Sequence, residues 1–298
     1  MKNKRSEEVI IIGGGPAGMS CAIQLKRCGI VPLIFDGDSI GGMLRYANLI
    51  ENYPGFPGGI KGADLVKRFK DQFKLEKLKC LHQNVLKLKY KQGQFEVITG
   101  SSSFTSRFLV IATGTKPRLI NDLEIEPSLA VSISYGIDGL TTKKNKHFVI
   151  VGAGDLAFDY SLSLREYNKI TILNRNGIPK CIPLLSERVK IRSNITYCKK
   201  AKLISIERSG KNKLKILYRS SKVGSVIVAD RLIFAIGRVP NLDLIDSEFN
   251  KEFNLLKRSG RLFVIGDAAN DHYRQSAIAA GDGIKAAMKI YEKNKRLK

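Results

Sequence analysis

A glycine-rich run near the N-terminus, GGGPAG (13–18), carries the spacing G-x-G-x-x-G. It follows an apolar segment with strand character and opens a segment with helical character. Gly13 permits a tight turn, Gly15 lets a pyrophosphate reach the backbone, and Gly18 lets the helix pack closely on the strand. Asp36 ends the next apolar segment, VPLIFD, where a carboxylate can bind a ribose hydroxyl. This combination of strand, turn, helix and acid predicts a dinucleotide-binding site.

A second turn of the same kind, GAGDLA (152–157), again lies between a strand segment and a helical segment. The strand after it, ITILNRN, ends at Asn174 and Arg175, where many dinucleotide sites carry an acid. An acid there would repel a 2′-phosphate, whereas an arginine attracts one. Lys180 follows shortly afterwards. The second turn therefore favours NADPH, with NADH as the alternative if Arg175 is only a solvated surface charge.

Two dinucleotide sites in one chain imply two cofactors that work together. A flavin and a nicotinamide form such a pair, because a flavin accepts a hydride and can release single electrons. The chemistry then needs no side-chain nucleophile or acid–base pair, only correct positioning of the two rings. Cysteines and histidines with zinc-ligand spacing do not occur, so no metal site is expected.

Alternating strand and helix segments must hold these turns in place. The clearest strand segments are EEVIII, VPLIFD, VLKLKY, FEVITG, FLVIATG, HFVIVG, ITILN, LKILYRS, SVIVAD, RLIFAIG and RLFVIG. Two further helices are expected, at ADLVKRFKDQFKLEKLK and AIAAGDGIKAAMKIYEKN. Proline-containing junctions near 116–120 and 237–242 are read as linkers. They divide the chain into a discontinuous first domain, 1–117 and 240–298, and an inserted second domain, 118–239.

The 298 residues carry a formal net charge of +24, spread along the whole chain. Such a charge steers acidic partners, although a lysine-rich background composition explains it equally simply. The even spread provides no basic arm, so nucleic-acid binding is not expected. No apolar run approaches the length of a membrane span, so no membrane partner is expected either.

Five cysteines are scattered along the chain, and no two of them form a C-x-x-C. They are Cys21, Cys28, Cys80, Cys181 and Cys198. An odd, scattered set is typical of a reducing compartment, so a cytoplasmic protein is expected. Cys21 and Cys28 are seven residues apart on the first helix, which suggests one buried face. Buried or inert thiols are therefore favoured over a substitute redox pair.

Six segments in their order along the chain resemble the low-molecular-weight thioredoxin reductase family. They are GGGPAGMSCAI (13–23), ENYPGFPGGIKG (51–62), FLVIATGTKPR (108–118), VGAGDLAFD (151–159), IFAIGRVPN (233–241) and VIGDAANDHYRQSAIAAG (264–281). The resemblance implies an α/β fold with two Rossmann-like, three-layer ββα nucleotide-binding domains. The NAD(P)H domain would be inserted into the FAD domain, and the protein would be a homodimer.

The resemblance also assigns cofactor-binding roles to matching positions. The FAD positions are Gly13, Gly15, Pro16, Ala17, Gly18, Asp36, Gly41, Gly42, Asn52, Val85, Ala112, Thr113, Gly114, Gly266, Asp267, Arg274, Gln275 and Ser276. Among them Val85 would contact the adenine through its backbone, Asp267 the ribityl chain, and Arg274 the isoalloxazine region. The NADPH positions are Gly152, Gly154, Asp155, Leu156, Ala157, Asn174, Arg175 and Lys180. Gly237 is also expected beside a cofactor.

Several positions depart from the family pattern. The family usually has His-Arg-Arg at 174–176, where this chain has Asn-Arg-Asn, and a further arginine at Lys180. Met43 stands where glutamine is usual. The largest departure is in AVSISYGIDGL (130–140), because the family carries C-x-x-C just before Asp-Gly. Alignment on that Asp-Gly places Ser134 and Ile137 at the two cysteine positions, and neither side chain can form a disulfide.

The expected activity is therefore a flavoprotein oxidoreductase that passes electrons from NAD(P)H through FAD directly to a protein acceptor. The chain is similar to ferredoxin/flavodoxin–NADP reductases of the thioredoxin-reductase type, which also lack C-x-x-C, and whose acidic carriers a basic surface would steer. Alternatives are a reductase for an iron–sulfur or lipoate-assembly enzyme and a flavin oxidoreductase acting on a small molecule. A non-enzymatic flavoprotein scaffold or sensor is a further class.

Overall fold

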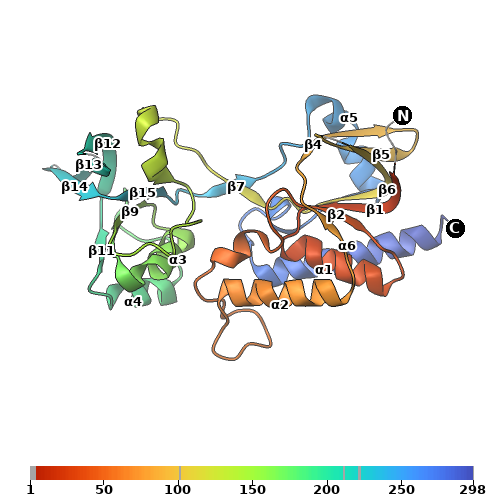
Figure 1. Cartoon of the computed structure of the whole chain (residues 1–298), viewed down its shortest axis with the longest axis horizontal. Coiled ribbons are helices and arrows are strands. Elements are labelled where there is room, and N and C mark those ends of the chain that lie inside the picture. Colours follow the sequence, from red (N-terminus) through yellow and green to blue (C-terminus); the bar gives the residue numbers. More distant parts are fainter. Residues whose placement is uncertain (1–4, 101, 211, 221–222, 298) are drawn as a thin grey trace. The chain divides into compact units, whose positions relative to one another are not determined.

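The computed structural model describes residues 5–100, 102–210, 212–220 and 223–297. The chain separates into two compact units (Figure 1). Unit 1 consists of Met1–Arg45, Leu49–Lys116 and Val239–Lys298, and unit 2 consists of Tyr46–Asn48 and Pro117–Arg238.

Unit 1 is built on a seven-stranded sheet with the order β3-β2-β1-β6-β5-β4, in which β17 also pairs with β6. The strands are β1 (Arg5–Ile12), β2 (Leu33–Phe35), β3 (Cys80–Leu81), β4 (Val85–Lys91), β5 (Gln94–Thr99), β6 (Ser103–Ile111) and β17 (Leu262–Val264). Strands β3, β2, β1, β6 and β17 run parallel, whereas β4 and β5 are antiparallel. Since parallel strands end at one edge, the segments that follow β1, β2, β6 and β17 share that edge.

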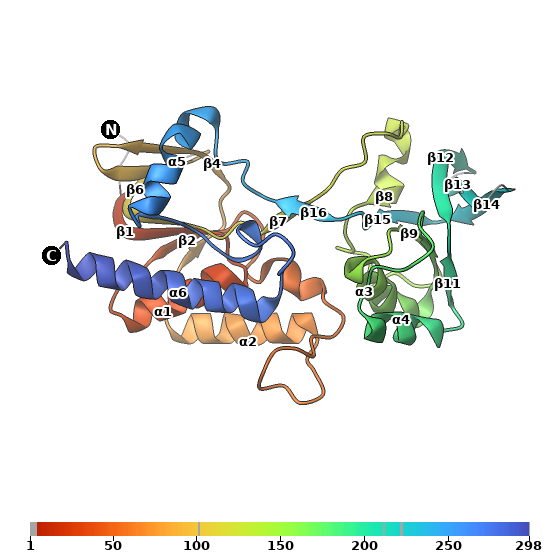
Figure 2. The same cartoon turned by 180° about the vertical axis from the view of Figure 1, so that it is seen from behind.

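The two faces of this sheet carry separate apolar cores, because successive side chains of a strand point to opposite faces. Val9 and Ile11 of β1 belong to the core that includes side chains of the helices α1 and α6. Ile10 and Ile12 belong to the core that includes side chains of β4, β5 and α5. The resulting three layers are visible in Figure 2. The helical elements are α1 (Pro16–Arg27), η1 (Gly42–Tyr46), α2 (Gly62–Leu75), α5 (Ser247–Arg258), η4 (Gly266–Ala268) and α6 (Ser276–Lys295).

Unit 2 repeats this three-layer plan around a five-stranded parallel sheet with the order β11-β10-β9-β15-β8. The strands are β8 (Ile133–Ser134), β9 (His147–Val151), β10 (Lys169–Leu173), β11 (Ile195–Cys198) and β15 (Arg231–Phe234). One face packs on α3 (Asp155–Leu164), η3 (Arg165–Tyr167) and α4 (Pro183–Lys190). The other packs on η2 (Pro127–Ser132) and on a meander of β12 (Ala201–Ser209), β13 (Lys213–Ser220) and β14 (Val223–Ala229). The expected α/β class with two Rossmann-like units is confirmed.

The inserted segment begins and ends in a two-stranded ribbon formed by β7 (Thr115–Pro117) and β16 (Arg238–Pro240). Backbone hydrogen bonds flank the ribbon. The amide of Arg118 donates to the carbonyl of Gly237 at 3.0 Å, and the amide of Asn241 donates to the carbonyl of Gly114 at 2.9 Å. The short segment Tyr46–Asn48 groups with unit 2 although its neighbours on both sides belong to unit 1.

Two helices were not expected from the sequence. Helix α5 begins at a capped end, because the carboxylate of Asp246 accepts a hydrogen bond from the amide of Phe249 at 2.8 Å. It then buries Phe249 and Leu256. Helix α4 buries only Val189, so its amphipathic signal is weak. Among the described residues, no helix combines the length and apolarity that crossing a bilayer would require.

Candidate functional site

The first glycine turn connects β1 to α1, and two of its glycines, Gly13 and Gly18, have no room for a side chain. Gly13 has a φ of +106°, and a Cβ added there would lie 2.2 Å from the carbonyl oxygen of Ala112. A Cβ added at Gly18 would lie 1.9 Å from the carbonyl oxygen of Gly13. These two glycines are therefore required by the turn and by the close packing of helix on strand.

Gly15 has a different surrounding, because a Cβ added there would meet no atom within 4 Å. Gly15 is the N-cap residue of α1, and Pro16 is the first helical residue. The first amides of a helix lack intrahelical partners and carry partial positive charge, so an open helix N-terminus suits a phosphate. The open space over a backbone floor fits the pyrophosphate of a dinucleotide.

The segment after β2 closes over this turn. The carboxylate of Asp36 accepts hydrogen bonds from the amides of Gly14, at 2.6 Å, and Asp38, at 2.9 Å. The amide of Gly41 donates to the carbonyl of Gly14 at 2.8 Å. A Cβ added at Gly42 would lie 3.4 Å from the Cα of Gly15. The residues expected around the pyrophosphate and ribose thus lie together at the carboxyl edge of the sheet.

The other expected FAD positions follow neighbouring parallel strands. Ala112, Thr113 and Gly114 follow β6, and the hydroxyl of Thr113 donates to the carbonyl of Asn241 at 2.5 Å. Gly266 and Asp267 follow β17 as part of η4. A Cβ added at Gly266 would lie 2.7 Å from the Cβ of Ala17, which brings η4 against α1.

Two distant segments of unit 1 also meet. The amide nitrogen of Asn52 donates to the side-chain oxygen of Gln275 at 2.9 Å. Ser276 is the first residue of α6, and the guanidinium of Arg274 donates to the carbonyl of Asn270 at 2.9 Å. Val85 begins β4, which belongs to the antiparallel part of the sheet.

The second glycine turn has the same construction within unit 2. Gly152 has a φ of +138°, and a Cβ added there would lie 2.2 Å from the carbonyl oxygen of Ala235. Gly154 is the N-cap of α3, and a Cβ added there would meet no atom within 4 Å. Ala157 is fully buried, as close packing of α3 requires, and Leu156 packs beside that core. Asp155 accepts a hydrogen bond from the amide of Ile182 at 2.8 Å.

Asn174 is buried at the end of β10 and holds its own loop together. Its amide nitrogen donates to the carbonyl of Ile178 at 3.1 Å and to the hydroxyl of Tyr197 at 2.7 Å. Its side-chain oxygen accepts from the amide of Asn176 at 3.0 Å. Arg175 and Lys180 are exposed. Of the three residues expected to bind NADPH here, Asn174 therefore has a structural role, whereas Arg175 and Lys180 are cations that face solvent.

The loop aligned with the family's cysteine pair offers no redox group. The hydroxyl of Ser134 donates to the carbonyl of Gly136 at 2.8 Å, and Ile137 is fully buried in the core of unit 2. The hydroxyl of Tyr160 is buried without a hydrogen-bond partner, 4.0 Å from the position of a Cβ at Gly136. Sequence reasoning missed Tyr160, which has no motif of its own.

All five cysteines are free thiols. Burial raises the pKa of Cys21, which lies within the core under α1 and α6. Burial, with the charge of Asp36 adding to it, raises the pKa of Cys80 to about 11. Burial also raises the pKa values of Cys181 and Cys198. Because the thiolate is the reactive form, these environments suppress thiol redox chemistry at neutral pH.

Asp159 of α3 was also missed. It is partly buried and accepts a hydrogen bond from the amide of Asn48 at 3.1 Å. Burial raises the pKa of its carboxyl to about 6, against the opposing effect of that hydrogen bond, and the charge of Asp155 raises it further. Sequence reasoning could not find this contact because Asn48 lies far away in the chain.

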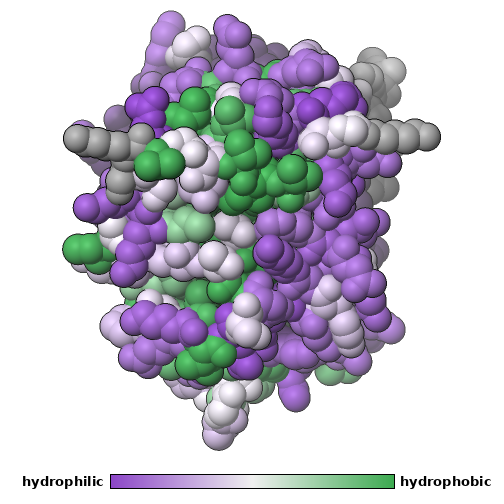
Figure 3. Space-filling model, turned by 90° about the vertical axis from the view of Figure 1, so that its left-hand side faces the viewer, coloured by the Kyte–Doolittle hydropathy of each residue, from purple (hydrophilic) through white to green (hydrophobic). Residues whose placement is uncertain are grey.

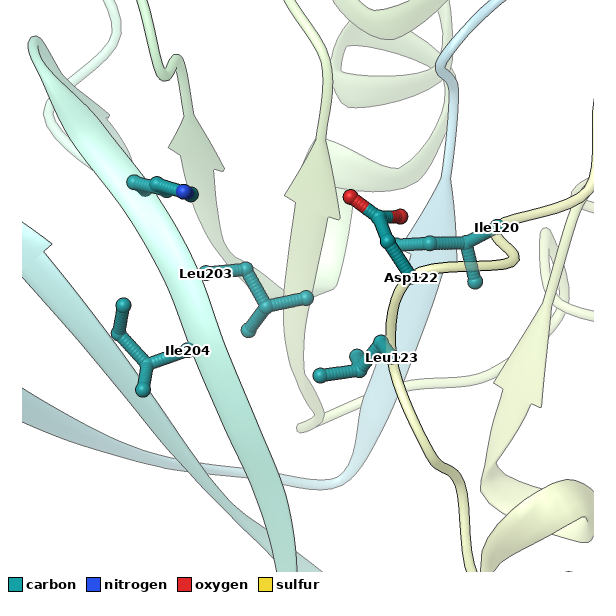
Figure 4. Close-up of a pocket in the computed structure, with 6 residues that line it drawn as sticks. Ile120, Asp122, Leu123, Leu203 and Ile204 are labelled. Carbon is teal, nitrogen blue, oxygen red and sulfur yellow. The ribbon is translucent and has the colours of Figure 1, made fainter.

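Away from the glycine turns, unit 2 carries a shallow pocket of about 200 Å³ between the segment at 120–123 and β12. In Figure 4 the side chains of Asp122 and Leu203 point toward it from opposite sides. The neighbouring meander exposes Ile204, Val226 and Val228. Figure 3 shows that hydrophobic side chains lie among hydrophilic ones on the face that it displays. Gly237 directly precedes β16, and its carbonyl accepts a hydrogen bond from the amide of Arg118. Within the described ranges, no group of three or more His, Cys, Asp or Glu side chains could hold a metal ion.

Comparisons with known proteins agree with this architecture. The family model described as pyridine nucleotide-disulphide oxidoreductase matches residues 7–283. A thioredoxin reductase of Dictyostelium discoideum is 30% identical over 314 residues, covering 97% of this chain and 97% of that protein. The crystal structure of T. acidophilum thioredoxin reductase superposes with a TM-score of 0.82 at 27% identity, covering 98% and 99% of the two chains. Bacillithiol disulfide reductase Bdr from Bacillus cereus shares the fold, with a TM-score of 0.75 at 18% identity over 97% and 100% of the chains.

Proposed function

The chain belongs to the pyridine nucleotide-disulphide oxidoreductase family, and from that membership we propose a more specific activity. The protein is an FAD-dependent NAD(P)H oxidoreductase that delivers electrons directly to a protein acceptor, without an active-site disulfide. The observation that carries the proposal is the cysteine inventory: no two cysteines form C-x-x-C, and a serine and a buried isoleucine occupy the aligned positions.

The chain's own residues contribute binding and orientation. The open helix N-termini at Gly15 and Gly154 suit two pyrophosphates, and the cations Arg175 and Lys180 favour the 2′-phosphate of NADPH. When bound, NADPH supplies a hydride and FAD supplies a group that takes two electrons and releases them singly. No thiol relay is needed, and the raised pKa values of Cys21, Cys80, Cys181 and Cys198 disfavour one at neutral pH.

Charge supports an acidic acceptor. The chain has a formal net charge of +24, which steers an acidic electron carrier such as ferredoxin or flavodoxin toward it. Two one-electron carriers would take the two electrons from each NADPH. The rate of this transfer should fall as salt rises, because screening weakens long-range attraction.

An anaerobic titration of the FAD-loaded protein with NADPH tests the proposal. One equivalent of NADPH should bleach the flavin completely, because two electrons fill the flavin and no disulfide competes for more. A requirement for two equivalents would reveal a second two-electron acceptor and contradict the proposal. Addition of oxidised ferredoxin or flavodoxin should then restore the flavin absorbance, whereas turnover with thioredoxin instead would assign the chain to disulfide reduction.

A matched control separates the thiols from the flavin. A variant with all five cysteines replaced by serine or alanine should show the same one-equivalent titration and the same carrier reduction. Loss of carrier reduction with retained flavin bleaching would mean that a thiol relay exists after all.

A further inference from the structure

We propose that Lys200 completes the cationic site for the 2′-phosphate of NADPH, an inference that rests on the proposed function. Lys200 lies outside the segment 174–180 in which the expected coenzyme-selecting residues occur. It belongs to the turn after the neighbouring parallel strand, β11. The carboxyl ends of β10 and β11 share one edge of the unit 2 sheet, where dinucleotides bind in this type of fold.

Backbone hydrogen bonds join the turn after β11 to the turn after β10. The amide of Asn174 donates to the carbonyl of Cys198 at 3.0 Å. In return, the amide of Ala201 donates to the carbonyl of Asn174 at 2.7 Å, and the amide of Lys200 donates to the carbonyl of Asn176 at 3.2 Å. The backbone of Lys200 is thus fixed beside the loop that carries Arg175.

The side chain of Lys200 runs toward the same loop. A Cβ added at Gly177 would lie 3.8 Å from the Cε of Lys200 and 4.0 Å from its Cγ, so the aliphatic stem passes over Gly177. Lys200 has a φ of +52°, a conformation that costs a residue with a side chain some free energy. The ammonium is one bond beyond Cε, so the Lys200 stem brings it close to Gly177 in the loop that carries Arg175.

The charge balance at this loop calls for another cation. A phosphate monoester carries a charge of about −1.5 to −2 at neutral pH. Asn174 is neutral and is already bonded to its own loop and to Tyr197, which leaves Arg175 and Lys180 as the cations of that segment. Over the ranges that the structure describes, no ion pair is recorded for Arg175, Lys180 or Lys200, so all three can meet an anion.

Binding of nucleotide fragments, measured by calorimetry at about 0.15 M salt, tests this assignment without using activity or FAD. The probes are adenosine 2′,5′-bisphosphate and 5′-AMP, which differ in the 2′-phosphate. Lys200→Gln should weaken binding of the bisphosphate about threefold to fivefold and leave 5′-AMP unchanged. Lys200→Arg should restore the affinity. The matched control is Lys199→Gln, which removes an exposed charge from the adjacent residue and should leave the binding of both probes unchanged.

The outcomes distinguish the inference from the function on which it rests. If Lys200→Gln behaves like Lys199→Gln while Arg175→Ala loses bisphosphate affinity, NADPH selection stands and the assignment of Lys200 is wrong. If the wild-type protein binds both probes equally, the proposed selection of NADPH fails, and the role of Lys200 fails with it. If Lys200→Gln weakens both probes alike, Lys200 acts on the fold of the loop and not on the 2′-phosphate.

Discussion

The side-chain amide of Asn174 donates a hydrogen bond to the hydroxyl of Tyr197, with 2.7 Å between nitrogen and oxygen. This contact ties the end of β10 to β11 and turns the Asn174 side chain toward the protein. The position at which an acid commonly contacts a ribose thus has a structural role in this chain. Under the proposed function, coenzyme selection falls to residues beside it.

Asn174→Asp should therefore destabilise the protein and should not switch its coenzyme preference from NADPH to NADH. The hydrogen bond that the amide donates to the carbonyl of Ile178 is lost, because a carboxylate oxygen would oppose a carbonyl oxygen there. The hydroxyl of Tyr197 can still donate to the carboxylate. We expect a loss of about 1–3 kcal/mol in the free energy of unfolding. Chemical denaturation measures it, with Tyr197→Phe as a milder control. A gain in NADH turnover at unchanged stability would show that the side chain faces the coenzyme.

Arg175→Ala should raise the Michaelis constant for NADPH about tenfold and leave that for NADH nearly unchanged. The guanidinium is exposed at the end of β10 and is expected to pair with the 2′-phosphate, which NADH lacks. Steady-state kinetics with both coenzymes provide the measurement. Equal effects on the two coenzymes would mean that Arg175 does not contact the 2′-phosphate.

Gly18→Ala and Gly15→Ala should separate the fold from the cofactor. The Cβ at Gly18 would lie 1.9 Å from backbone, so we expect that substitution to cost about 3 kcal/mol or more in stability. Gly15 has an extended backbone with a φ of −73°, and a Cβ there meets nothing within 4 Å. That variant should fold normally yet retain little FAD, as judged by its thermal transition and by flavin absorbance after gel filtration. Full FAD retention by Gly15→Ala would place the pyrophosphate elsewhere.

Asp159→Asn should stabilise the protein at neutral pH but not at pH 4. Burial raises the carboxyl pKa to about 6 in the folded state, above the ordinary value of 3.8 that applies when the chain is unfolded. As the pH rises from 4 to 6 the unfolded state loses its proton first, so this group makes folding less favourable, and the penalty is constant above 6. Asparagine keeps an oxygen that can accept from Asn48. A gain of about 1–2 kcal/mol at pH 7.5 is expected, and an equal gain at pH 4 would assign it to another cause.

The glycine turns could be predicted from the sequence because Gly13, Gly18 and Gly152 meet local steric or backbone demands, such as the +106° φ of Gly13. The strands before them were equally clear, since continuous apolar runs are typical of buried parallel strands. Helix α4 was missed because it buries only Val189 and leaves little amphipathic pattern. The inward direction of Asn174, the approach of Lys200 to Gly177 and the raised pKa of Asp159 depend on contacts between separate segments. Such contacts have no signature in a single sequence.

The ribbon of β7 and β16 brings the two ends of the inserted segment together. Its entry at Thr115–Pro117 and its exit at Arg238–Pro240 are neighbouring strands, so a single break in the chain of unit 1 accommodates all of unit 2 except the short segment Tyr46–Asn48. A deletion variant in which a two-residue turn replaces residues 118–237 should therefore still bind FAD and be yellow, but should no longer oxidise NADPH. A colourless or insoluble product would show that unit 1 needs unit 2 in order to fold or to bind FAD. A yellow product would show that the two units are separable modules connected by the ribbon.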